Sequence, residues 1–186
     1  MKMRRLFAVG VVVAAITSLI STNAYASGHD TLSKVRHVTA KYQNVGTAQT
    51  AGYALLVDKD GIACIDMPGM GAMGVHYVKG DLVGDGKVDA LRPEAVVYEP
   101  AGGGKLRLVA VEYVVFKADW DAHHRTKPRL FGHKFDTTLS PNRYGLPAFY
   151  SLHAWIFKAN PAGTFAMWNP RVHCPGSSGH GGHGGH

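Results

Sequence analysis

Three ionisable side chains stand inside apolar segments that read as β-strands, and their types match the donor set of a transition-metal site if the sheet brings them together. Glu112 lies in the apolar run 108–116, in which both faces of the strand are apolar, so we expect a central strand. His153 lies likewise in 149–157, and His76 lies in a third short strand. Because burying an unpaired carboxylate is costly, Glu112 must be paired, protonated or bound to a metal ion.

Two imidazoles and one carboxylate bind zinc, iron(II) or copper and leave coordination positions open. With or without a metal, the same three side chains could act as the acid, base and orienting group of an enzyme, in a pocket lined by Tyr77, Tyr113 and Trp155. A structural network is the plain alternative, in which Glu112 bonds an Arg, Lys or Tyr and each His is capped by a backbone carbonyl. That alternative makes the chain an envelope component without a site.

A methionine repeat offers softer ligands. Met67, Met70 and Met73 form the pattern M-x-x-M-x-x-M within a glycine-rich segment. Thioethers favour Cu(I), and the pattern resembles the methionine motifs of copper transporters and exported copper-handling proteins. Ordinary core or loop methionines are the alternative.

Both ends of the chain carry further histidines. Cleavage after Ala26 would expose Ser27-Gly28-His29, which resembles the amino-terminal copper and nickel motif: an amine, two amide nitrogens and the imidazole of His29 form a square-planar set. At the other end, the glycine-rich tail 176–186 repeats a histidine every third residue, and such a tail chelates zinc, nickel or copper weakly. These tail histidines are His180, His183 and His186.

The N-terminal segment has the order of a secretory signal peptide. Lys2, Arg4 and Arg5 precede an apolar run over 6–20, and Ala24-Tyr25-Ala26 supplies small residues at the cleavage positions. We expect residues 1–26 to be removed from a protein exported to the periplasm or the exterior, with no transmembrane segment left; an uncleaved anchor is the alternative. Removal would leave 17 basic and 13 acidic residues, a net charge of +4 rather than +7.

Two cysteines remain in the exported chain. In an oxidising compartment we expect Cys64 and Cys174 to form a disulfide. Metal thiolates or a catalytic cysteine are the alternatives. The bridge would tie the C-terminal end to the early part of the domain.

Several other functions are disfavoured. The scattered Lys and Arg residues form no basic stripe, so we expect no nucleic acid partner. Residues 69–74 spell G-x-G-x-x-G, but a strand follows where a dinucleotide site needs a helix, so we expect no nucleotide cofactor. With 46% hydrophobic and 18% charged residues, the chain is suited to one folded domain.

The pattern of elements predicts an α+β fold. Apolar residues at spacings of three and four indicate a helix from Asp30 to about residue 52, broken near 44–46. Later segments read as strands: 54–57, 75–78, 95–99, 105–116, 149–157 and, less regularly, 165–172. We therefore predict a single domain over 27–175, in which an N-terminal helical segment packs on a mainly antiparallel sheet with one disulfide.

Segments spread over the domain resemble an uncharacterised family of exported bacterial proteins. The resemblance covers roughly residues 30–175 and rests on His76-Tyr77-Val78, Arg92-Pro93-Glu94, Val111-Glu112-Tyr113, Leu152-His153-Ala154-Trp155 and the run from Asn160-Pro161 to Arg171-Val172. It implies a single exported domain and no activity. The functional prediction therefore rests on the residues themselves: we expect an exported protein that binds copper, zinc or nickel.

Overall fold

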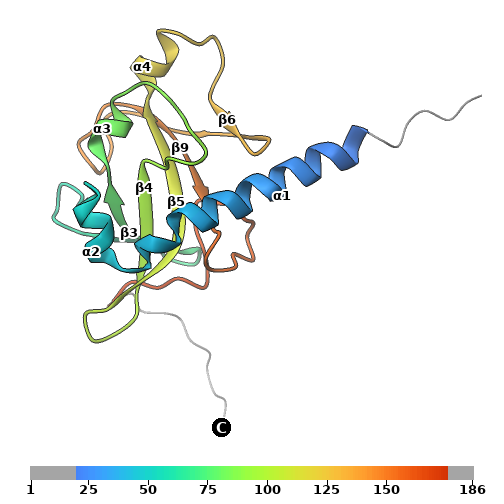
Figure 1. Cartoon of the computed structure of the whole chain (residues 1–186). Helices are drawn as coiled ribbons and strands as arrows, with labels where there is room; N and C mark the ends of the chain where they lie inside the picture. The colour runs from blue at the N-terminus through green and yellow to red at the C-terminus, as the bar shows by residue number, and fades with distance from the viewer. Residues whose placement is uncertain (1–19, 176–186) are drawn as a thin grey trace, which may run out of the picture.

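The computed structural model describes the backbone of residues 20–175 and the side chains of residues 30–175. Within that range the predicted α+β fold is confirmed: helical segments at the N-terminal side accompany an antiparallel sheet, and Cys64 and Cys174 form the predicted disulfide (Figure 1). The predicted tail and most of the predicted signal segment lie outside the described residues.

The N-terminal helical segment has three parts: α1 (Ile20–Thr39), the 3-10 helix η1 (Ala40–Gln43) and α2 (Val45–Thr50). The predicted start at Asp30 is wrong, because α1 is already helical from Ile20. The predicted break is confirmed, since Asn44 adopts an extended conformation and its side chain accepts a hydrogen bond from the Gly46 N–H at 2.9 Å.

Seven strands form the main sheet, in the order β1-β3-β4-β5-β9-β8, with β2 pairing on β3; a separate hairpin joins β6 and β7. The bounds are β1 (Ala54–Leu55), β2 (Cys64–Met67), β3 (Gly71–Val78), β4 (Ala95–Pro100), β5 (Leu106–Phe116), β6 (Arg129–Leu130), β7 (His133–Lys134), β8 (Asp136–Thr138) and β9 (Phe149–Ala154). Two short helices, α3 (Gly80–Val83) and α4 (Lys117–Asp121), lie in the connections. The expectation that Glu112 lies on a central strand is confirmed, because β5 pairs with both β4 and β9.

Two segments differ from the sequence prediction. Strand β2 is missed because its four residues carry no alternating pattern and end in the glycine-rich segment. Residues 165–172 form no strand; one isolated bridge joins Asn169 to Ala72. Pro170 lacks the N–H group that would continue such a ladder.

The two faces of the sheet have different covers. Helical residues Val35, Tyr42 and Ala48 pack in one large core with strand residues such as Val96 and Val111, and α1 crosses the strands there (Figure 1). The C-terminal segment packs on the other face, where Val172 and Cys174 form a smaller core with residues of β3 to β5. The second face also carries the histidines and the glutamate predicted to bind a metal.

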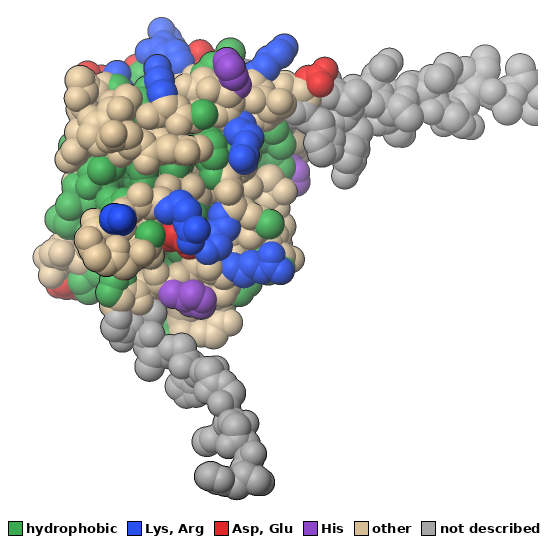
Figure 2. Space-filling model, turned by 60° about the horizontal axis from the view of Figure 1, so that its bottom comes forward, with side chains coloured by type: hydrophobic (Ala, Val, Ile, Leu, Met, Phe, Trp, Pro, Cys, Tyr) green, Lys and Arg blue, Asp and Glu red, His purple; other side chains and the backbone are tan. Residues whose placement is uncertain are grey.

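No helix in the range 20–175 combines the length and the apolar character that crossing a membrane requires. On the face seen in Figure 2, Lys and Arg side chains lie in several separate groups with apolar side chains between them.

Candidate metal centre

Three neighbouring positions on one face of the sheet bring the predicted donors together. Glu112 of β5 lies directly opposite His153 of β9 and, on its other side, opposite Ala95 of β4. His76 of β3 lies opposite Val97, two residues along β4 from Ala95. Directly paired residues point to the same face, so all three donors share it. The small Ala95 leaves room for His76 to reach Glu112 across the intervening strand.

The side-chain tips meet within a few ångström. His76 Nε2 lies 3.4 Å from Glu112 Oε2 and 3.3 Å from His153 Nε2. On its other side, the His153 ring approaches Glu112 Oε1 through Nδ1 at 3.5 Å. One donor atom from each residue can be chosen so that all three lie within 4.8 Å of one another. The expectation that three residues far apart in the sequence converge is therefore confirmed.

These separations match the spacing around a metal ion. Ligand atoms at about 2.1 Å from a tetrahedral centre lie about 3.4 Å from one another. Two donor pairs in the group already have that spacing, at 3.3 and 3.4 Å. Small rotations of the His153 ring and the Glu112 carboxylate would bring the third pair into range, so little of the site has to be reorganised.

Burial sets the protonation of the group. His76 and His153 are each 3% exposed and Glu112 is 8% exposed. Burial lowers the pKa of each imidazole to about 4, so both rings are neutral at pH 7, the form in which histidine binds metals. Burial raises the pKa of Glu112. The neighbouring His76 and a hydrogen bond from Ser151 lower it and offset part of this shift. A metal ion would bind the carboxylate form of Glu112, so its affinity should depend on pH.

Neighbouring groups fix the two rings. The His153 ring stacks on Trp155 with centroids 5.9 Å apart, and it meets the His76 ring edge to face at 5.5 Å. His76 Nδ1 is buried and has no hydrogen-bond partner of good geometry in the described part of the chain. The predicted structural network describes this group only in part: the Gly74 backbone contributes a hydrogen bond to His76, but the ionic neighbours of Glu112 are the two imidazoles rather than an Arg or Lys.

An apolar cavity of about 340 Å³ opens directly on the three donors. Met67 and Met73 line it, so two of the three predicted methionines lie beside the histidines, whereas Met70 is 52% exposed and does not line it. Gly74 explains how Met73 and His76, three residues apart, reach one cavity: its φ of +101° interrupts the regular alternation of β3. A Cβ there would lie 2.4 Å from the Tyr98 carbonyl oxygen, which excludes other residues.

The prediction that Tyr77, Tyr113 and Trp155 line the pocket is wrong. Tyr77 and Tyr113 pack in the core on the helical face of the sheet, and Trp155 lies in the smaller core beneath the C-terminal segment. The cavity is instead closed by Met167 and Trp168 and by the loop 139–148. Sequence reasoning missed these residues because only the sheet order decides which loops stand over the donors.

The remaining predicted ligands cannot be placed. The side chain of His29 and the tail histidines His180, His183 and His186 lie outside the described residues. In the full chain, residues 27–29 belong to α1, so the square-planar set would need the cleavage that creates a free amino terminus.

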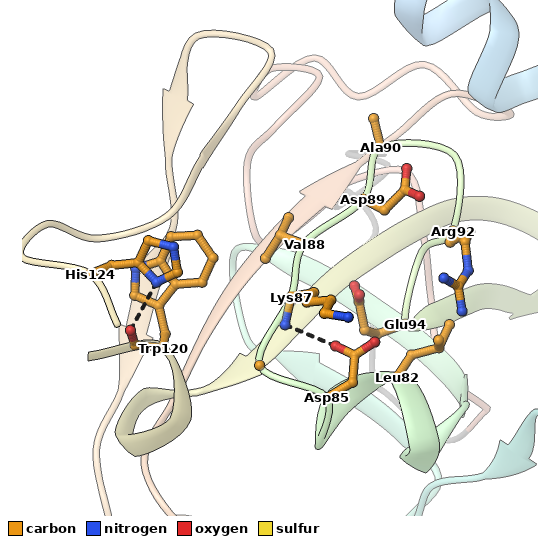
Figure 3. Close-up of a pocket in the computed structure, with 11 residues that line it drawn as sticks. Leu82, Asp85, Lys87, Val88, Asp89, Ala90, Arg92, Glu94, Trp120 and His124 are labelled. Atoms are coloured by element: carbon orange, nitrogen blue, oxygen red, sulfur yellow. Dashed lines mark hydrogen bonds between the residues drawn. The ribbon is translucent and has the colours of Figure 1, made fainter. Parts of the chain in front are cut away.

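A second hollow, of about 560 Å³, lies on another part of the molecule and holds a buried glutamate that the sequence does not indicate (Figure 3). Glu94 directly precedes β4, is 2% exposed, and accepts a hydrogen bond from the Val114 N–H at 3.0 Å. The stacked rings of Trp120 and His124 face it across the hollow, with centroids 3.7 Å apart. This hollow gathers no second metal-binding group, because the described side chains form one such group, that of His76, Glu112 and His153.

Glu94 leads to a prediction on stability. Burial raises its pKa from 4.5 to about 8, so the unfolded chain ionises this group at a lower pH than the folded protein does. Stability contributed by the protonated carboxyl is therefore complete below about pH 4.5 and is lost as the pH rises through about 8. Glu94→Gln keeps an acceptor for Val114 and cannot ionise. Between about pH 5 and about pH 9, the free energy of unfolding of the wild type should fall by on the order of 4 kcal/mol relative to that of the variant. Urea unfolding at a series of pH values measures this difference. Parallel pH profiles would contradict the assignment.

Comparisons with models of protein families, with curated proteins and with solved structures find no significant match. The geometry of the His76, Glu112 and His153 group is therefore the main support for any function.

Proposed function

We propose that this chain is an exported protein that binds one transition-metal ion through His76, Glu112 and His153, with copper as the favoured ion and zinc or nickel as alternatives. The observation that supports the proposal is the convergence of these three buried donors, from strands β3, β5 and β9, with one donor atom of each within 4.8 Å of the others and two of the pairs at 3.3 and 3.4 Å. Burying a carboxylate such as that of Glu112 without a basic partner costs folding free energy unless a metal ion or a shared proton compensates its charge.

The chemistry of the surroundings favours copper. Two neutral imidazoles and a carboxylate suit Cu(II), zinc and nickel alike. Met67 and Met73 add thioether sulfurs to the same cavity, and thioethers select Cu(I) among these ions. His29, Met70 and the tail histidines would act as accessory capture sites on the way to this centre.

A metal-dependent enzyme is the second candidate, and the cavity favours it. A catalytic metal site keeps an open position beside a space for substrate, and the 340 Å³ cavity lies at the donors. A purely structural envelope protein is supported less well, because that function predicts a Glu112 held by a basic residue and no cavity nearby.

A metal titration tests the proposal. Calorimetry with Cu(II), Zn(II) and Ni(II) is expected to show one tight site that persists when His180, His183 and His186 are all replaced by alanine. At a free metal concentration about 1,000 times the Kd, binding adds about 4 kcal/mol, so Tm should rise by about 10 °C. Binding that is weak and disappears with the tail histidines would refute the site in the domain.

A further inference from the structure

The wall of the cavity is almost entirely apolar outside the metal-binding group. Its sides include Val78, Val114, Phe116, Phe149 and Leu146, and the donors form one end. A volume of about 340 Å³ falls in the range of small-molecule sites. Water gains few partners on such a surface, so displacing it with an apolar molecule is favourable.

The guanidinium and amide side chains of the wall are already engaged. Arg143 and Glu112 are the only lining residues of a charged type, and the Arg143 guanidinium binds Asp58 Oδ2 through Nε at 3.2 Å and Nη2 at 2.7 Å. Asn142 donates to the carbonyl oxygens of Leu139 and Leu146 and accepts from backbone N–H groups of the same loop. A charged group on the part of a ligand that lies away from the metal would therefore lose its hydration without gaining a free counter-charge.

The loop over the cavity is held in place. Besides the guanidinium contact, the Arg143 carbonyl accepts a hydrogen bond from the Lys59 N–H at 2.9 Å. Asp58 is 4% exposed and also accepts from the N–H groups of Asp60 and Ile62. The same segment that carries Arg143 also carries Tyr144 and Leu146 of the wall. The cavity thus has a preformed shape rather than one that must be organised by a ligand.

From these observations we infer that the cavity binds an uncharged, apolar small molecule whose single coordinating group occupies the open position of a metal ion held by His76, Glu112 and His153. The inference rests on the proposed metal site. Three protein ligands leave at least one position open, and the sheet occupies the side away from the cavity, so that position faces the apolar space. The apolar body supplies affinity and the coordinating group fixes the orientation.

A pair of probes tests the inference on the full chain loaded with one equivalent of Cu(II), with the three tail histidines replaced by alanine. Imidazole and 4-phenylimidazole carry the same coordinating group, and only the second has an apolar body. We expect 4-phenylimidazole to bind at least about tenfold more tightly, as followed by the visible absorption and paramagnetic resonance of the copper.

Cavity-filling variants locate the effect. Leu146→Trp and, independently, Val114→Phe place extra bulk in the cavity and should remove the advantage of 4-phenylimidazole. Leu91→Trp is the matched control, because Leu91 is 45% exposed and does not line this cavity.

The copper content of each protein is measured first, which separates the two proposals: a wild type that takes up no copper refutes both. Copper uptake with equal affinity for both probes, or an advantage that survives both filling variants, overturns the apolar-ligand inference alone.

Discussion

Glu112→Gln is expected to weaken metal binding by at least about 100-fold while leaving the metal-free protein folded. The amide keeps the shape of the side chain but removes the one anionic ligand, and even partners outside the ligand set change affinity by 10- to 100-fold. Burial raises the pKa of Glu112 and so disfavours its ionised form, and a neutral glutamine of the same shape should cost the metal-free fold little. Calorimetric titration and thermal unfolding of the same samples measure the two effects separately.

The chain offers a matched control for this substitution. Glu94 is also a buried glutamate beside β4 and β5, but it lines the other hollow. Glu94→Gln should therefore retain metal binding. Equal losses in the two variants, or an unchanged affinity in Glu112→Gln, would show that Glu112 is not a ligand.

Replacing both Cys64 and Cys174 by serine is expected to lower the free energy of unfolding by about 3 to 5 kcal/mol. The bridge closes a separation of 110 residues, and loop-closure entropy for about 100 residues corresponds to about 4.7 kcal/mol. For a domain of this size the loss lowers Tm by about 10 °C. Urea unfolding, followed by tryptophan fluorescence, measures the effect.

A reductant provides the control for the cysteine variant. Dithiothreitol should destabilise the wild type by the same amount and leave the double variant unchanged. A wild type that is indifferent to the reductant under unfolding conditions would mean that the bridge contributes nothing to stability.

The strands that carry the donors could be predicted from the sequence, because both faces of these segments are apolar. The apolar run around Glu112 indicates a strand buried on both faces, and the structure places it between two others. The disulfide could also be predicted, since two cysteines have one way to pair once the signal-like N-terminal segment is taken to predict export to an oxidising compartment. The convergence of His76 with the other two donors could only be proposed, because it depends on the order β3-β4-β5-β9 and on a small residue, Ala95, at the crossing point.

The surroundings of the site could not be predicted. The pocket wall depends on which loops cross the donor-bearing face, and periodicity within a strand says nothing about that. The methionine spacing likewise indicates soft ligands, but only the backbone conformation at Gly74 decides that Met73 points to the cavity, while Met70 is exposed. The features that local sequence patterns determine, such as the strands that carry the donors, are predicted correctly. The features that depend on long-range topology, such as the cavity wall, are not.

The position of the disulfide along the chain has a consequence for the order of assembly. All three donors precede Trp155, whereas Met167 and Trp168, which cover the cavity, come from the stretch that Cys174 anchors to β2. A nascent chain therefore contains His76, Glu112 and His153 before residues 167–168, which line the same cavity, have been synthesised. Formation of the Cys64–Cys174 disulfide then holds this late segment against the sheet, so the cavity gains its last lining residues only after all three donors have been synthesised.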